Sequence, residues 1–223
     1  MDSTQRWDRL ARQTGTAGIA GTVLLFAPVI AVSGLGEPPL HADEQEVVAF
    51  FDATAETGWF EATETVLLIG TLVLLWSLVG LGLLLRRAEG QPAWRSAMVV
   101  VSAGLFAAYA IVDVSWDVAG RHGSDLDAGL AHYAFDTGNL GFANTWLALG
   151  SLAAASGWVT LETRTLPRWT GWLALFAAVG FIVARFVWTT EAWLVPYSAF
   201  WVWFLAVCIH LLRKPGSLSA ATP

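Results

Sequence analysis

Six long apolar blocks, separated by short polar segments, account for most of the chain. Each block approaches the roughly 20 residues that an α-helix needs to cross a hydrocarbon core about 30 Å thick. The blocks are apolar on every face and do not alternate, which is typical of membrane-spanning helices and not of barrel strands. The pattern predicts one all-α transmembrane domain over residues 1–223, a bundle of about six helices at about 15–32, 62–85, 97–116, 138–161, 171–188 and 194–212.

The first block has a second interpretation. Three arginines precede it and it ends at Ala31-Val32-Ser33, a pattern shared with secretory signals that carry a small-residue cleavage site. However, the apolar run is long for a signal, and Asp2 and Asp8 dilute the positive charge in front of it. We therefore expect a retained span.

Basic residues indicate how the bundle is oriented. With the N-terminus inside, the inner segments hold ten of the twelve Lys and Arg residues, all except Arg121 and Arg185. Positive charge in short loops stays on the cytoplasmic side of a membrane. We therefore expect a multi-pass protein of the bacterial cytoplasmic membrane with both termini in the cytoplasm. Fourteen of the eighteen acids lie on or near the outer side, so the outer end is strongly acidic.

The amino-acid composition limits which classes of binding partner to expect. Of the residues, 56% are hydrophobic and 13% are charged, and the mean hydropathy is +0.57, so the lipid bilayer is the expected main partner. No basic patch favours nucleic acid. The single cysteine, Cys208, excludes an intrachain disulfide and a Cys-based metal cluster. Most of the thirteen tryptophans fall near span ends, where amphipathic rings are stable, and a membrane-protein partner or a second copy is left open.

The longest outer segment, residues 34–61, begins with a turn at Gly36-Glu37-Pro38-Pro39. Apolar and acidic residues then mix over residues 43–56. This pattern predicts a short amphipathic helix that either lies on the membrane surface or caps the bundle.

Polar residues gather at the predicted outer ends of three spans. Ionisable groups within membrane helices are costly, so they face the bundle interior or water and mark candidate sites. Spacings of three or four residues place such groups on one helical face. The candidate ligand-binding residues are Glu61, Glu64, Asp113, Asp117, His132, Asp136 and Asn139, together with Arg185 at the outer end of the fifth span.

Two interpretations of this cluster stand side by side. Carboxylates and imidazole on neighbouring helices can hold a divalent metal ion, which is the cofactor that this first interpretation implies, with Asp113, Asp117, His132 and Asp136 as its ligands. Glu64 would then act as general base for hydrolysis by a metal-activated water. Alternatively, Arg185 pairs with one or two of the acids and the others are solvated.

The sequence leaves three functional hypotheses. The first is an outer acidic site that binds a cation or polar ligand, with or without catalysis. The second is a non-catalytic accessory or scaffold subunit of a membrane complex. The third, transport of a small molecule, is weakened because the middle of most spans lacks polar residues.

Two motifs carry a resemblance to a known group of proteins. They are Phe135-Asp136-Thr137-Gly138-Asn139 and Leu166-Pro167-Arg168-Trp169-Thr170-Gly171-Trp172, separated by one predicted span. Here the chain resembles an uncharacterised bacterial family of six-span membrane proteins, a domain of unknown function. The resemblance implies the fold, with Asp136 and Asn139 as marked positions, and implies no activity.

Overall fold

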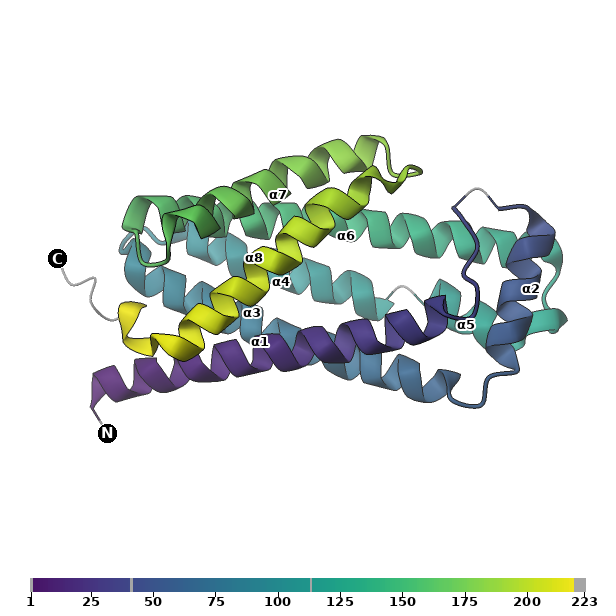
Figure 1. Ribbon diagram of the computed structural model, residues 1–223, viewed down its shortest axis with the longest axis horizontal. Coiled ribbons are helices and arrows are strands. Elements are labelled where there is room, and N and C mark those ends of the chain that lie inside the picture. Colours follow the sequence, from purple (N-terminus) through teal and green to yellow (C-terminus); the bar gives the residue numbers. More distant parts are fainter. Residues whose placement is uncertain (1, 41, 113, 219–223) are drawn as a thin grey trace.

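A computed structural model describes residues 2–40, 42–112 and 114–218, and this part of the chain is helical without any strand. Six long helices lie alongside one another in an elongated bundle (Figure 1). They are α1 (Ser3–Ser33), α3 (Phe60–Glu89), α4 (Trp94–Val112), α6 (Ala128–Thr163), α7 (Arg168–Phe186) and α8 (Leu194–Arg213). The shorter elements are α2 (Glu44–Ala55), α5 (Ser115–His122), η1 (Gly123–Asp125), η2 (Glu191–Trp193) and η3 (Pro215–Leu218).

The predicted helical bundle is confirmed, and so is its apolar character. Among the described residues, five helical stretches are long and apolar enough to cross a membrane. The longest helix, α6, has 36 residues but is not among them. Its apolar part is diluted by Asn139, Asn144 and several Gly and Ser residues. The five stretches are Ser3–Ser33, Phe60–Glu89, Trp94–His122, Arg168–Phe186 and Glu191–Arg213.

The long helices form a closed ring in chain order. Contacts link α1 to α3, α3 to α4, α4 to α6, α6 to α7 and α7 to α8, and α8 returns to α1. The α1–α3 pair is close because its interface uses glycine. A Cβ added to Gly70 would lie 2.8 Å from the backbone of Leu24, and one added to Gly21 would meet Leu74 at the same distance. Small residues at an interface let helix backbones approach closely.

Two elements extend beyond the predicted spans at the acidic end. The third block does not continue as one helix to residue 116, because α4 ends at Val112 and α5 begins at Ser115. The fourth begins at Ala128 instead of 138, after Asp127 accepts a hydrogen bond from the Gly129 amide. No proline separates this polar start from the apolar block, so one helix contains both the polar residues 128–137 and the predicted span 138–161.

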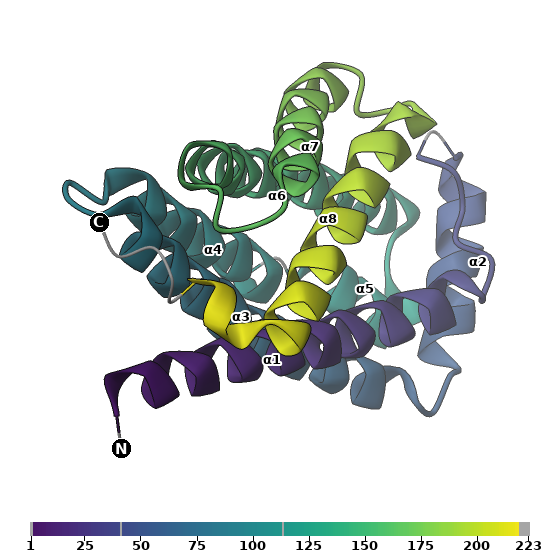
Figure 2. The same cartoon turned by 60° about the vertical axis from the view of Figure 1, so that its left-hand side comes forward.

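A second, smaller core holds these extensions together. It contains Ala42, Val47, Phe50, Phe51, Ala119, Ala131 and Phe135, from α2, α5, the start of α6 and the loop before α2. Trp116 packs against it, stacked on Phe135 with ring centroids 5.5 Å apart. We call α2, α5, η1 and residues 128–140 of α6 the outer cap, after the side of the membrane on which the sequence predicts them. α2 crosses the end of the bundle, and both views place it away from the N-terminus (Figure 1, Figure 2).

Candidate functional site

The outer cap is tied to the bundle by an ion-pair network centred on Arg121. Its guanidinium, from α5, contacts the carboxylate of Glu64 and lies 3.7 Å from Oε1 of Glu61, both in the first turns of α3. The charge of Asp117 also acts on Arg121. Glu64 is buried, and its second oxygen, Oε1, has no hydrogen-bond partner. Three of the predicted site residues therefore surround one guanidinium, and the network carries a surplus of negative charge.

Arg185, which the sequence suggested as the partner of the acids, makes a different contact. Its Nε donates a hydrogen bond of 3.1 Å to Oδ1 of Asn144, from α7 to α6. The role expected of Arg185 at the acids of α3 is taken by Arg121. Sequence reasoning missed the pairing of Arg121 with the acids of α3. The i, i+4 spacing of Asp117 and Arg121 was the available signal, because it places Arg121 beside a member of the acidic cluster.

The predicted residues of α6 lie on the outer cap. His132 and Asp136 are neighbours at i and i+4, with Nε2 and Oδ1 3.9 Å apart, and both are partly exposed to solvent. Asn139, one turn further, has a buried Nδ2 without a hydrogen-bond partner. The i, i+4 spacing thus places the imidazole of His132 beside the carboxylate of Asp136. The Asn139 amide lies one turn further along the same helix, where its Nδ2 is buried.

These residues do not assemble a metal centre within the described part of the chain. No three His, Cys, Asp or Glu side chains there come close enough to hold a metal ion. Asp117, His132 and Asp136 therefore do not form a site by themselves. Asp113, the fourth predicted ligand, lies outside the described residues.

A groove opens on the outer cap, between α2 and the loop that precedes it. Its volume is about 410 Å³. The loop is held in shape at its start, because the Ser33 hydroxyl donates a 2.6 Å hydrogen bond to Glu37 and because Gly36 adopts a φ of +92°, which favours glycine. The groove is lined by Leu35, Gly36, Glu37, Pro38 and Pro39 from the loop and by Glu46, Ala49 and Phe50 from α2.

We call this surface the outer groove, and all the charge on its lining residues is negative. Glu37 and Glu46 are its two carboxylates, and the other lining residues are apolar or glycine. The surrounding segment, residues 34–61, contains seven acids and neither Lys nor Arg. Glu46 also lies in the first turn of α2, where a negative charge stabilises the helix dipole. The outer groove is therefore suited to a ligand that combines positive charge with an apolar part.

Sequence analysis did not identify Glu37 and Glu46 as site residues. They are nine positions apart and come together only because the loop folds back along α2. The turn at Gly36 and the rigid Pro38-Pro39 pair were the available signals, since they fix where the chain reverses. The other wall of the outer groove, however, is formed by α2, and its position depends on how α2 packs against the other elements of the outer cap.

Comparison with protein-family models, with curated proteins and with solved structures finds no match to this chain. The functional argument therefore rests on the chemistry and geometry of its own residues.

Proposed function

We propose that the chain is a six-span integral membrane protein of the bacterial cytoplasmic membrane that binds a cationic organic ligand in the outer groove. Both termini are inside, and the outer cap faces the extracytoplasmic space. One observation carries the binding proposal: two carboxylates line an otherwise apolar groove in a segment that contains neither Lys nor Arg.

The length of α6 supports the six-span arrangement. At 1.5 Å per residue its 36 residues extend about 54 Å, well beyond a hydrocarbon core of about 30 Å. Its polar start can therefore stand in the outer cap while residues 138–161 cross the membrane. The start of α1 and the end of α8 also lie at the same end of the bundle, as an even number of spans requires (Figure 1).

Cysteine labelling tests the orientation. The native Cys208 is 1% exposed, so it contributes little background. We expect a membrane-impermeant maleimide on intact cells to label Glu56→Cys, on the outer cap, and to leave Gln91→Cys, between α3 and α4, unlabelled. Permeabilised cells should show both. Labelling of Gln91→Cys alone on intact cells would reverse the proposed orientation.

The chemistry of the outer groove favours an organic cation over a metal ion. Two exposed carboxylates supply only part of the six to eight oxygen ligands that a calcium site takes, or of the octahedron that magnesium needs. A quaternary ammonium group makes no such demand, because its charge is spread over methyl groups that tolerate apolar walls. An aromatic ring attached to it can pack against Leu35 and Phe50.

Isothermal titration calorimetry with benzyltrimethylammonium, on protein in lipid nanodiscs, tests this proposal. Neutral benzyl alcohol is the matched ligand without charge. Each exposed charge contact is worth about 0.2–1 kcal/mol, so Glu37→Gln or Glu46→Gln should weaken binding by about 1.4-fold to fivefold. The double variant should lose up to about 30-fold if the effects add.

Glu56→Gln is the control, because it removes the same charge from the C-terminal end of α2, outside the outer groove. Its affinity should equal that of the wild type. Unchanged affinity in the double variant, or equal binding of benzyl alcohol, would contradict the proposal. That outcome would favour the accessory-subunit hypothesis, which a co-purifying partner lost on deletion of residues 40–56 would support.

A further inference from the structure

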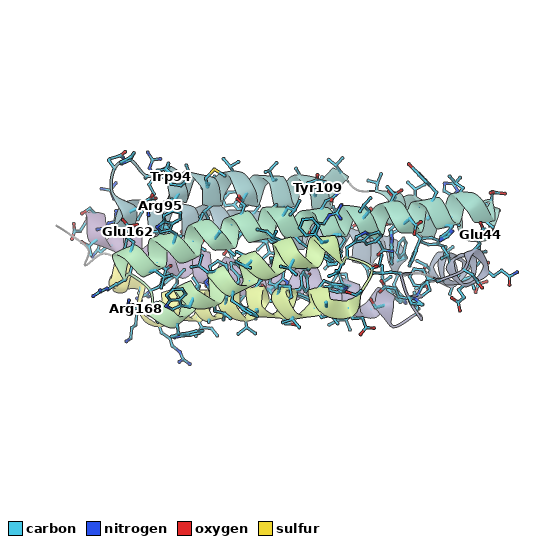
Figure 3. The ribbon with its side chains drawn as sticks, turned by 90° about the horizontal axis from the view of Figure 1, so that it is seen from above. Glu44, Trp94, Arg95, Tyr109, Glu162 and Arg168 are labelled. Atoms are coloured by element: carbon cyan, nitrogen blue, oxygen red, sulfur yellow. The ribbon has the colours of Figure 1, made fainter. Side chains whose placement is uncertain are left out.

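A second groove lies at the other end of the molecule, on the surface between α6 and α7. It has a volume of about 540 Å³ and is lined by Trp158, Leu161, Glu162 and Leu175. Figure 3 shows Glu162 at one end of the bundle, close to Trp94 and Arg95, and Glu44 of α2 at the opposite end. We call this surface the inner groove. Its walls are apolar except for one carboxylate at the end of α6.

The carboxylate of the inner groove belongs to a charged triad. Arg95 lies between two acids: its Nε is 2.8 Å from Oε1 of Glu89, and its Nη1 contacts Glu162. Glu89 is also held by the amide and hydroxyl of Ser96. With two carboxylates and one guanidinium, the triad has a net charge of −1. The Glu89 side chain is 1% exposed and that of Glu162 is 55% exposed, so the surplus charge is available at the inner groove.

Aromatic side chains indicate the depth of the inner groove in the membrane. The Arg95 guanidinium lies 5.5 Å from the ring centroid of Trp158 and 6.0 Å from that of Trp94. The two indoles contact each other edge to face, and both are more than half exposed. Exposed indoles next to charged groups are stable where lipid tails meet headgroups. A groove at this depth on a membrane-facing surface meets both the headgroup and the upper acyl chain of a lipid.

We infer that the inner groove binds an aminophospholipid, with the primary ammonium of the headgroup on Glu162 and an acyl chain along Leu161, Leu175 and Trp158. Charge complementarity selects this lipid class. The carboxylate repels a purely anionic headgroup, and a choline headgroup has no N–H to donate to it. A second membrane helix would bury the surplus charge of the triad, which is costly in a low dielectric.

The inference rests on the membrane-spanning arrangement proposed above and not on the outer groove. Native mass spectrometry of the purified protein, after incubation with equimolar phosphatidylethanolamine, phosphatidylcholine and phosphatidylglycerol, tests it. We expect retention of phosphatidylethanolamine about 1.4-fold to fivefold above either other lipid, the range expected for one exposed charge-assisted contact. Binding of benzyltrimethylammonium is an independent measurement, so either proposal can fail alone.

Two variants separate the headgroup from the groove. Glu162→Gln should reduce retention of phosphatidylethanolamine to the level of phosphatidylcholine. Leu175→Trp should lower retention of all three lipids, because the larger side chain fills the inner groove while the triad stays intact. Glu191→Gln, an exposed acid before α8, is the control and should retain the wild-type preference.

Equal retention of the three lipids by the wild type would overturn the inference. So would a preference for phosphatidylethanolamine that survives both Glu162→Gln and Leu175→Trp. If Glu162→Gln fails to fold because it breaks the triad, Leu175→Trp decides alone, since unchanged lipid retention in that variant would place the lipid elsewhere.

Discussion

Replacing Phe51 by Ala should release the outer cap without unfolding the bundle of long helices. The Phe51 ring is 1% exposed and lies 5.5 Å from the ring of Phe50, 6.0 Å from that of Trp116 and 6.5 Å from that of Phe135. These residues belong to the small core of the cap, which shares no buried residue with the main core of the bundle. The two cores can therefore open independently.

The expected loss follows from burial. Truncating a fully buried Phe to Ala costs about 3–5 kcal/mol, from the lost transfer free energy and the remaining cavity. α2 has 12 residues, a length at which an isolated helix is marginal in water, so its order depends on this packing. A loss of about 3–4 kcal/mol raises the opening equilibrium of the cap by about 100-fold to 1,000-fold.

Hydrogen exchange followed by mass spectrometry measures this directly. Peptides from α2 should lose about two to three orders of magnitude of protection in Phe51→Ala, whereas peptides from the middle of α3 should not change. Phe186→Ala is the matched control, because that ring is 85% exposed on α7. A loss of less than tenfold in α2, or an equal loss in α3, would refute the view of the cap as a separate cooperative unit.

Two further substitutions test contacts of the cap. Gly138→Ala would drive a Cβ into the indole of Trp116, so thermal denaturation should show a loss of about 1–3 kcal/mol in the free energy of unfolding. Gly104 faces open space, so Gly104→Ala is the control and should not destabilise the protein. Equal melting temperatures of the two variants would contradict this prediction. Arg121→Gln leaves the buried carboxylate of Glu64 without its charge partner and should lower the melting temperature. The additional change Glu64→Gln removes that charge and should restore part of the lost stability. An Arg121→Gln variant as stable as the wild type would show that the pair contributes nothing.

The helical bundle could be predicted because its long helices coincide with long apolar runs of the sequence. A span needs a long apolar run, and the runs in this chain are bounded by features that end or begin helices. Arg86 and Arg87 lie in the last turn of α3, and Gly90, which has a φ of +72°, directly follows the helix. Pro167 directly precedes the first residue of α7. Such signals are local, so they can be read from the sequence.

The outer cap and its groove depend on contacts between distant segments, which composition does not encode. The polar start of α6 continues the helix past the apolar block because Ala131 and Phe135 pack on α2. Glu64 pairs with Arg121 of α5, whereas Arg185 of α7 donates its hydrogen bond to Asn144 of α6. Sequence reasoning therefore grouped polar residues that the structure also places near one another on α3, α5 and α6, but it did not identify their partners.

Photolabelling tests the central claim, that a cationic ligand occupies the outer groove. Protein in nanodiscs is irradiated with 4-azidobenzyltrimethylammonium and digested, and the adducts are mapped by mass spectrometry. We predict adducts within residues 35–50, suppressed by excess benzyltrimethylammonium and weaker in the double variant Glu37→Gln/Glu46→Gln at the same ligand concentration. Adducts confined to other segments, such as the start of α6 around His132 and Asp136, or labelling as strong in the double variant as in the wild type, would contradict the account.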